Sequence, residues 1–257
     1  GDFFFFFSGN KALLCLPMDY IAGKMMFVRA LILGLDLDFI EPTSNPLQNN
    51  NTNYDFVAMV PMQVQNSIKN LSQIKKLIIG GTSINHQLKN DLMQQPTQIF
   101  ETYGMTETCT HVAAKKIGTD IFNALPNVSF SIDDRNCLTI DASKISSEKI
   151  ITNDIVELIS NNQFVLKGRI DNVINSGGVK LFPEEIESKL SSHITNRFYI
   201  TSNEDEALGQ KVVLVIESEP YKMEDAIFND LSKFEKPKQI IFKPKFEETI
   251  SGKVIRK

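Results

Sequence analysis

GRIDNVINSGGVK, residues 168–180, is the stretch at which the texture of this sequence changes. Before it, apolar runs alternate with segments of helical period, and after it the elements become short and compact. A lone Gly-Gly pair would indicate only a turn. An arginine, an aspartate and paired glycines at fixed offsets are hard to explain by folding alone, so we predict a binding segment here and a small α+β domain after it.

The residues before this stretch predict α/β architecture built on a parallel sheet. Apolar runs bounded by turn residues predict strands, and mixed three-to-four spacing between them predicts helices. The expected strands are Ala12–Leu16, Leu37–Ile40, Lys76–Ile79 and the run from Gln98 into Glu101-Thr102-Tyr103-Gly104. The expected helices are Ile21–Leu33 and Ile84–Met93, and Gln48–Asn53 is expected as a polar loop. This order of strands, glycine turns and helices favours ligand sites at the strand ends.

From Val128 onward, short strands with polar turns predict a small β-subdomain. They are Val128–Ile132, Leu138–Ile140, Ile155–Ile159 and Phe164–Leu166, with a hairpin tip at Asn161-Asn162. The last part predicts helices over Glu184–Leu190 and Met223–Phe234, and strands over Arg197–Thr201, Lys211–Ile216 and Gln239–Phe242. The predicted fold class is therefore α/β, with a large N-terminal domain, a small β-subdomain and a compact α+β C-terminal domain.

The composition is that of an ordinary globular protein. The 257 residues are 42% hydrophobic and carry a formal net charge of −4, so no global basic field indicates nucleic acid as a partner. The Phe3–Phe7 run is too short to span a bilayer, and no membrane span is expected. The cysteines Cys15, Cys109 and Cys137 form no CxxC pair, which favours a reducing, cytoplasmic compartment over disulfides or a zinc site.

Four clusters carry candidate chemistry, and each has a plain structural alternative. In Tyr103–Thr108, a hydroxyl can bond phosphate and a carboxylate can hold Mg²⁺, but Thr106 can equally cap a helix with Glu107 in its first turn. Asp154 at a strand edge can bind the hydroxyls of a ribose or simply sit in an Asn-Asp turn. The Gly168–Lys180 cluster is followed by Pro183 and glutamates, which make a good helix start and are expected to be structural. The lysine of Ser251-Gly252-Lys253 can deliver charge to a phosphate and a carboxylate together, or belong to a solvated basic tail.

The clusters occur in the order, and at roughly the separations, found in the adenylate-forming superfamily of acyl–CoA synthetases, nonribosomal-peptide adenylation domains and luciferases. The chain resembles that superfamily from about Leu13 to its C-terminus. Tyr103–Glu107 resembles the Tyr-Gly-x-Thr-Glu signature, and Gly80-Gly81-Thr82 resembles the segment that lies against the adenine and acyl group. The resemblance makes Tyr103, Gly104 and the Gly80–Thr82 segment nucleotide-binding, together with Asp154 and Arg169 at the ribose.

The same resemblance assigns roles in the C-terminal part. Asp171 falls on the hinge between an N-terminal domain over residues 1–170 and a mobile lid domain over residues 171–257. Lys253 falls on the adenylation lysine, and Gly177-Gly178 on the loop that reaches the CoA tunnel. The implied cofactors are ATP, Mg²⁺ and CoA. Thr106 would assist Lys253 in catalysis, and Glu107 would be the metal ligand.

Within the superfamily, Leu14–Lys24 and Arg29 most resemble the o-succinylbenzoate–CoA ligases of menaquinone biosynthesis. That substrate is an aromatic dicarboxylate, so a cationic side chain near the acyl pocket is expected. Arg29 is the candidate, with Tyr20 also toward the acyl substrate. The alternative is that Arg29 forms a buried ion pair with Asp36 or Asp38.

One departure concerns the Ser/Thr/Gly-rich phosphate loop that should precede the Leu13 strand. Ser8-Gly9-Asn10-Lys11 has no repeated hydroxyls and does not match it. We expect the N-terminal domain to be incomplete in this chain, because the later motifs are intact; a degenerate family member is the alternative.

The resemblance implies an AMP-forming acid–CoA ligase that takes a small-molecule carboxylate, ATP and CoA, and it is compatible with a homodimer. The implied acid is o-succinylbenzoate. The alternatives are another acyl– or aryl–CoA ligase, an adenylation domain that charges a carrier protein, and a noncatalytic nucleotide-binding fragment.

Overall fold

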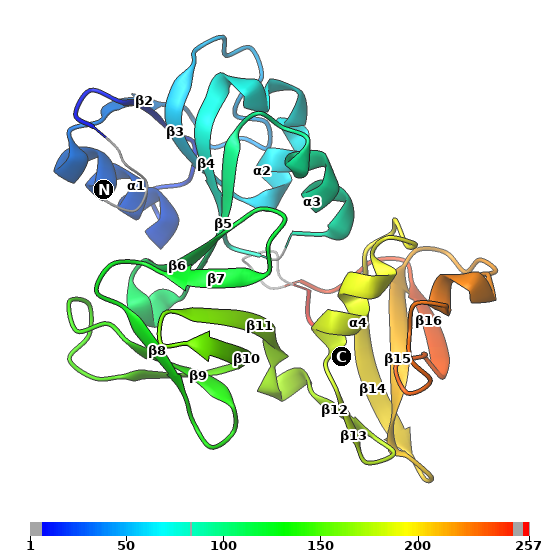
Figure 1. Ribbon diagram of the computed structural model, residues 1–257. Coiled ribbons are helices and arrows are strands. Elements are labelled where there is room, and N and C mark those ends of the chain that lie inside the picture. The colour runs from blue at the N-terminus through cyan, green and yellow to red at the C-terminus, as the bar shows by residue number, and fades with distance from the viewer. Residues whose placement is uncertain (1–6, 83, 249–253, 257) are drawn as a thin grey trace.

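Two β-sheets carry the residues that the computed structural model describes, 7–82, 84–248 and 254–256 (Figure 1). The larger sheet has eleven strands among the described residues, in the order β2-β1-β3-β4-β5-β6-β7-β11-β10-β9-β8. These strands are β1 (Lys11–Leu14), β2 (Asp36–Phe39), β3 (Tyr54–Met59), β4 (Ile74–Ile79), β5 (Gln98–Gly104), β6 (His111–Lys116), β7 (Ile121–Ala124), β8 (Ser129–Ile132), β9 (Cys137–Asp141), β10 (Ile150–Ser160) and β11 (Gln163–Arg169).

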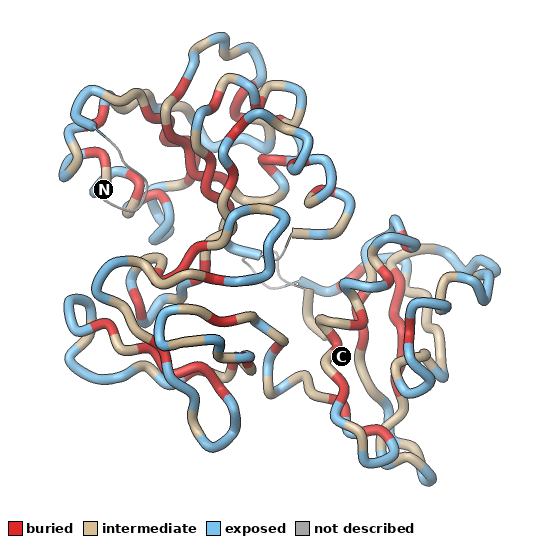
Figure 2. The backbone as a smooth tube through the Cα atoms, viewed as in Figure 1, coloured by how far each residue is buried: buried red, intermediate tan, exposed pale blue. Residues whose placement is uncertain are grey.

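The first half of the large sheet is parallel and is covered on both faces. Strands β2, β1, β3, β4 and β5 all pair in parallel. Helix α1 (Ile21–Leu33) packs Met26 and Ala30 onto one face, where Phe56 is buried. Helix α3 (His86–Met93) packs its buried leucines onto the other face, and the short α2 (Pro61–Asn66) follows β3. Burial on both faces explains why the central strands β1 and β3 are mostly apolar, whereas the edge strand β2 is not; Figure 2 shows the centre of this part as buried.

The second half of the large sheet is antiparallel and forms the small β-subdomain. Its core is aromatic, with the Phe164 ring centroid 5.3 Å from that of Tyr103 and 5.0 Å from that of Phe130. Ser160 pairs with Gln163 across Asn161-Asn162, which confirms the predicted hairpin tip. Strand β5 is the junction, because it pairs in parallel with β4 and antiparallel with β6.

The smaller sheet follows a single 3₁₀ turn, η3 (Ile170–Asn172). Its strands are β12 (Ile174–Ser176), β13 (Val179–Leu181), β14 (Phe198–Asp205), β15 (Gly209–Glu217) and β16 (Gln239–Lys243). Helix α4 (Pro183–Leu190) covers one face of β14 and β15 through Ile186 and Leu190. The other face is covered by Phe246 and Val254 near the C-terminus.

The predicted helix over Met223–Phe234 is wrong. Among the described residues this stretch holds one 3₁₀ turn, η4 (Asp225–Phe228), and then bends. Asn229 and Asp230 follow that turn directly, and short polar side chains of this kind compete with helical hydrogen bonds. The apolar residues still pack, since Leu231 is buried and Ile227 and Phe228 lie against it. The periodic spacing therefore reflected contact with the sheet and not a regular helix.

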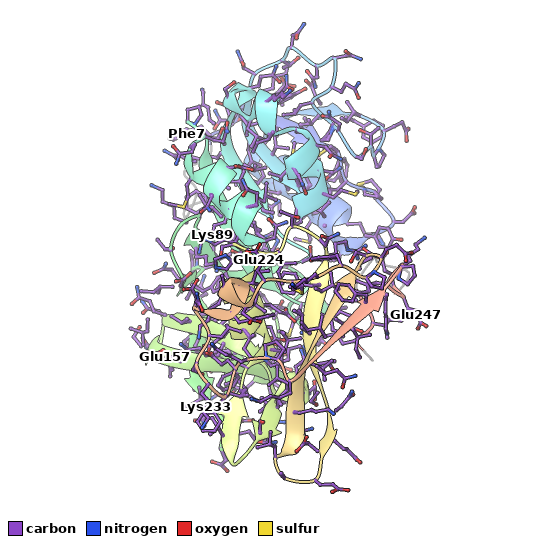
Figure 3. The ribbon with its side chains drawn as sticks, turned by 90° about the vertical axis from the view of Figure 1, so that its right-hand side faces the viewer. Phe7, Lys89, Glu157, Glu224, Lys233 and Glu247 are labelled. Carbon is purple, nitrogen blue, oxygen red and sulfur yellow. The ribbon has the colours of Figure 1, made fainter. Side chains whose placement is uncertain are left out.

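The other predictions of the fold are met closely. Helix α1 spans the predicted residues, and the strands that were predicted lie within a few residues of their ranges. Strands β3, β6, β7, β12 and β13 and helix α2 were not predicted. The structure confirms the α/β class with a parallel sheet, a β-subdomain and a smaller α+β part. No helix in the described ranges is long and apolar enough to cross a membrane. The labelled charged side chains of Glu157 and Lys233 lie at the surface (Figure 3).

Candidate active site

The candidate site is built where β5 meets the β10–β11 hairpin. Tyr103 is the last residue but one of β5, and its hydroxyl donates to Asp154 Oδ2 at 2.5 Å. Asp154 and Arg169 face one another across β10 and β11, and Arg169 Nη1 lies 3.5 Å from Asp154 Oδ1. Burial, followed by the Asp154 charge, raises the pKa of Tyr103, so its proton stays on the phenol. Three residues that the sequence separates widely thus form one network.

The arginine of this network is shared with the segment between the two sheets. Arg169 Nη2 lies 3.1 Å from Asp171 Oδ2, and the Asn153 amide lies 3.3 Å from the same oxygen. Partial desolvation of Arg169 opposes its charge, but Asp171 and Asp154 outweigh it and raise the pKa. Asp154 is 9% exposed, whereas the Arg169 side chain is 53% exposed. The site therefore has a buried acid and an open cationic rim.

Sequence reasoning missed two groups that hold this rim. Arg135, in the β8–β9 turn, donates to Asn153 Oδ1 at 3.2 Å and to the Thr152 carbonyl at 3.1 Å. Asn153 could have been suspected as the neighbour of Asp154. Arg135 carries no local signal, because only the folded hairpin brings it to β10.

Thr106 and Glu107 lie in a 3₁₀ turn directly after β5. The alternative that Thr106 caps a helix is wrong. The residue that precedes the turn is Met105, and its N–H is capped by the hydroxyl of Thr108, which accepts it at 3.0 Å. Thr106 and Glu107 are exposed, and no hydrogen bond or ion pair of either side chain is found in the described ranges. Within those ranges no three His, Cys, Asp or Glu side chains gather as a metal cage. A single carboxylate is what Mg²⁺ requires when substrate phosphates supply its other oxygens, so Glu107 fits that ion.

Gly80-Gly81-Thr82 lies at the end of β4, on the strand next to β5. A Cβ on Gly80 would lie 2.8 Å from Thr102 Oγ1, which itself donates to the Ile79 carbonyl at 3.0 Å. Only glycine fits there without displacing Thr102. The strand order therefore places this segment beside Tyr103 and Gly104, as a candidate nucleotide site requires.

Arg29 lies on α1, over the Phe56 ring at 5.4 Å from its centroid. The alternative ion pair is not seen: within the described ranges no carboxylate lies within 4.0 Å of Arg29, while Asp38 pairs with Lys11 at 3.5 Å. Burial lowers the pKa of Arg29. Tyr20 is 58% exposed at the start of the helix, about 13 Å along the axis from Arg29 by helical rise.

The C-terminal candidates lie apart from the Tyr103 network. Gly177 and Gly178 form the β12–β13 turn, with φ of 58° and 81°, and the hairpin extends away from β5 in Figure 1. Lys253 lies outside the described residues. Near it in sequence, Arg256 binds Glu187 of α4 with two bonds, at 2.7 and 2.9 Å, and Glu187 Oε1 also accepts the Ile200 N–H at 2.8 Å.

Helix α4 also contacts the end of the large sheet. Asn172 Nδ2 donates to Glu184 Oε1 at 2.5 Å, and the other oxygen of Glu184 is buried without a hydrogen bond in the described structure. Glu185 of α4 lies 3.6 Å from Lys167 of β11. These polar contacts hold the smaller sheet in its present position.

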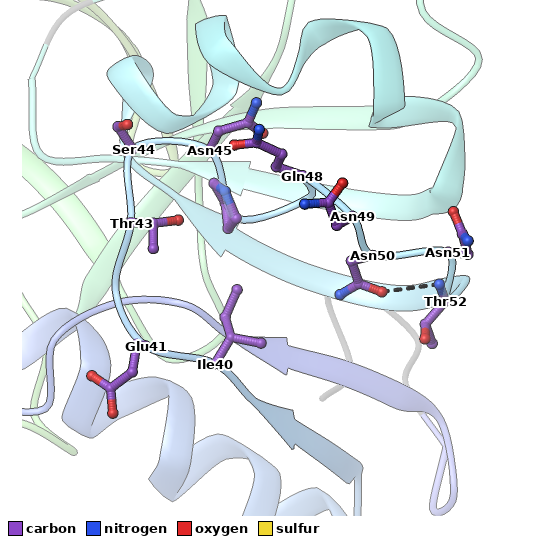
Figure 4. Close-up of a pocket in the computed structure, with 11 residues that line it drawn as sticks. Ile40, Glu41, Thr43, Ser44, Asn45, Gln48, Asn49, Asn50, Asn51 and Thr52 are labelled. Atoms are coloured by element: carbon purple, nitrogen blue, oxygen red, sulfur yellow. Dashed lines mark hydrogen bonds between the residues drawn. The ribbon is translucent and has the colours of Figure 1, made fainter.

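One hollow of the described structure lies elsewhere. It measures about 590 Å³ and is lined by the loop between β2 and β3, including Asn45, Asn49 and Asn51 (Figure 4). Asn50 accepts the Thr52 N–H at 2.9 Å, so the loop partly bonds to itself. The hollow contains none of the predicted site residues.

Comparison with known proteins places these features in a family. The chain is 37% identical to an acyl-CoA synthetase (AMP-forming)/AMP-acid ligase II-like protein from Dyadobacter fermentans, whose crystal structure it matches with a TM-score of 0.63 over 96% of this chain and 77% of that one. The chain belongs to the AMP-forming acyl-CoA synthetase family. No family model matches it.

Other members of this AMP-forming synthetase family are more distant. A 2-succinylbenzoate–CoA ligase of Escherichia coli is 24% identical over 88% of this chain, and one of Lactococcus lactis is 22% identical over 98%. An o-succinylbenzoate CoA synthetase from Bacillus subtilis, solved with ATP and magnesium, shares the fold with a TM-score of 0.81 at 17% identity, over 95% of this chain and 60% of that one. The chain spans 54% and 62% of the length of the two curated relatives.

Proposed function

We propose that the protein is an AMP-forming acid–CoA ligase and that its acid is 2-succinylbenzoate. The observation that carries the proposal is the network of Tyr103 and Arg169, at the ends of β5 and β11, with Asp154 within β10. A buried acid beside an exposed arginine suits a ribose with its adjoining phosphate, because the acid accepts from hydroxyls and the guanidinium donates to anionic oxygen.

In the first half-reaction the substrate carboxylate attacks the α-phosphate of ATP, giving an acyl-adenylate and pyrophosphate. No protein nucleophile is needed, so the chain contributes position and charge. Thr106 bonds phosphate, Glu107 holds Mg²⁺, which neutralises phosphate charge when bound, and Lys253 bridges the carboxylate and phosphate oxygens. The exposed Thr106 and Glu107 side chains support these roles.

In the second half-reaction the CoA thiolate attacks the acyl carbonyl, and AMP leaves. The charge that favours adenylation is not needed in this step, and CoA requires an entry route. We therefore propose that residues 171–257 turn as a unit about Asp171, which withdraws Lys253 and brings Gly177-Gly178 toward the acyl group. The present position of that hairpin, away from β5, is compatible with the arrangement before turning.

The proposed acid rests on two supports. The 2-succinylbenzoate–CoA ligases of Escherichia coli and Haemophilus influenzae, 24% and 25% identical, are among the curated relatives. Arg29 is a cation without a carboxylate partner in the described ranges, which suits an acid with a second carboxylate.

The test is ATP–pyrophosphate exchange by the full-length protein with a panel of acids. We expect exchange that depends on 2-succinylbenzoate and Mg²⁺, followed by thioester formation when CoA is added. Exchange with a different acid alone would overturn the substrate, and no exchange with any acid would favour a noncatalytic nucleotide-binding module. Lys253→Ala should slow exchange at least about a hundredfold while sparing thiolysis of supplied acyl-adenylate.

A carrier-protein ligase is a second candidate. A 3,4-dihydroxybenzoate–[aryl-carrier protein] ligase of Bacillus anthracis is 26% identical over 72% of this chain. Supplying CoA and an aryl-carrier protein in parallel reactions separates the two, since only the true acceptor should release AMP during turnover.

A further inference from the structure

His111 is a histidine that the proposed mechanism does not use. It opens β6 and pairs with Gly104, the last residue of β5. Its Nε2 lies 3.8 Å from the position that a Cβ on Gly80 would take. Two glycines therefore leave the imidazole beside the ends of β4 and β5, where the acyl and adenine groups are proposed to bind.

The ring of His111 is partly buried but has no hydrogen-bond partner within the described ranges. An imidazole in such a place normally donates to or accepts from a neighbour, because desolvating its nitrogens costs free energy. Burial and then the Arg29 charge lower the pKa of His111 to about 4, so the ring is neutral at pH 7.

Arg29 reaches the same face of the sheet from α1. Phe56, under Arg29, belongs to the core cluster on the α1 side, together with Ala58 and Ile78. Because side chains alternate along a strand, Gly80 follows Ile78 on that face. The other charged pair near these strand ends, Glu101 with Lys115 at 3.2 Å, follows the opposite alternation and is already satisfied. Arg29 is thus the charge that acts on His111, and neither side chain has a described carboxylate partner.

We propose that His111 is a specificity residue of the acyl site, which together with Arg29 receives the second carboxylate of the substrate, the one that is not activated. This inference rests on the proposed ligase function and deepens it. A carboxylate between the two groups supplies the missing counterion of Arg29 and a hydrogen-bond acceptor for the imidazole. It also favours the imidazolium form, so the substrate binds together with a proton.

The test compares two acids that differ only in the second carboxylate, 2-succinylbenzoate and 4-oxo-4-phenylbutanoate, in the exchange reaction. In His111→Phe, kcat/KM for the dicarboxylate should fall about tenfold to a hundredfold, mainly through KM, because a charge-assisted hydrogen bond is lost. The monocarboxylate should change less than about threefold. Equal losses with both acids, or no loss with either, would overturn the proposal.

Proton uptake gives a readout that a purely structural role would not move. Calorimetric titration of 2-succinylbenzoate in buffers of different ionisation enthalpy should show a fraction of a proton taken up at pH 7 by the wild type and none by His111→Phe. His193→Gln is the matched control, because His193 lies in the turn after α4, 2.9 Å from Asp230 and away from the proposed acyl site.

Wild-type binding without proton uptake would overturn the role of His111 while leaving the ligase intact. A wild type that neither binds nor activates 2-succinylbenzoate, yet exchanges with another acid, would overturn the inference and the proposed substrate together. A wild type inactive with all acids would instead count against the ligase function.

Discussion

Two largely buried carboxylates, Asp154 on β10 of the large sheet and Glu187 on helix α4 beside the small one, each contact an arginine, and the two contacts differ. Arg256 binds Glu187 through both guanidinium nitrogens, at 2.7 and 2.9 Å, and a backbone N–H adds a third bond. Arg169 reaches Asp154 with one nitrogen at 3.5 Å and shares its other with Asp171. The first carboxylate is saturated, and the second keeps capacity for further donors.

This difference in hydrogen bonding indicates that the Glu187–Arg256 pair is structural and that the Asp154–Arg169 pair is functional. A saturated, two-point pair fixes the chain, here residues 254–256 against α4 and β14. A carboxylate with one tyrosine donor and one distant arginine is an acceptor awaiting hydroxyl groups. Three changes test this contrast, beginning with the largest expected effect.

Arg256→Ala should destabilise the protein by about 3 kcal/mol at pH 8, because it strands the buried Glu187 carboxylate. Urea unfolding followed by far-UV circular dichroism measures the change. Lys89→Ala is the control, since its carboxylate partner Asp120 is 72% exposed and stays in water when the pair is broken. That control should cost about 1 kcal/mol or less. Equal losses of stability in the two variants would contradict the structural role given to the Arg256–Glu187 pair.

Asp154→Asn should weaken nucleotide binding about tenfold to a hundredfold, roughly 1.4 to 2.8 kcal/mol, and change unfolding by about 1 kcal/mol or less. The amide keeps the shape of the carboxylate and still accepts from Tyr103, but it loses the charge that faces Arg169. Calorimetric titration with ATP and Mg²⁺ gives the affinity. If Asp154→Asn bound ATP normally but lost as much stability as Arg256→Ala, Asp154 would be structural and its proposed role in nucleotide binding would be wrong.

Lowering the pH from 7.5 to 5 should change the free energy of unfolding through His111 and Glu187 with opposite signs, by about 2 kcal/mol each. The pKa of His111, in the large sheet, is lowered from 6.5 to about 4, so its stabilisation is complete above pH 6.5 and is lost as the pH falls toward 4. The pKa of Glu187, on helix α4 against the small sheet, is raised by burial from 4.5 to about 7, so its contribution is complete below pH 4.5 and is lost as the pH rises toward 7. Hydrogen exchange at pH 5 and 7.5, corrected for intrinsic rates, should show the large sheet loosened by acid and the small sheet tightened. A change of exchange protection in the same direction in both sheets would contradict the roles given to His111 and Glu187.

The sequence predicts the fold best where structure is local. Helix α1 was predicted with its true bounds because its apolar residues recur at three-to-four spacing. The stretch over Met223–Phe234 has similar spacing, but Asn229 and Asp230 interrupt it. Periodicity reports which side chains are buried, and it leaves the backbone to be decided by the residues between them.

The candidate site was predicted as a set of residues and not as an arrangement. Asp154 faces Arg169 only because β10 and β11 pair with irregular register between Ile155 and Val156. Tyr103 comes to both through β6, β7 and β11, which lie between β5 and β10 in the sheet. His111 was not predicted at all, since its significance depends on Arg29, which a different part of the fold delivers. Sequence motifs therefore identify site residues, but the distances between these residues depend on the long-range pairing of strands.

The burial of the cysteines has a practical consequence for spectroscopy. Cys15 and Cys137 are buried, and burial raises the pKa of Cys15 to about 12, whereas Cys109 is exposed two residues after Glu107. A maleimide dye, which reacts with thiolates, will therefore label Cys109 selectively among the three. The native chain thus carries a single fluorescent reporter position beside the proposed phosphate site, and emission from it can time each substrate's arrival without any engineered cysteine.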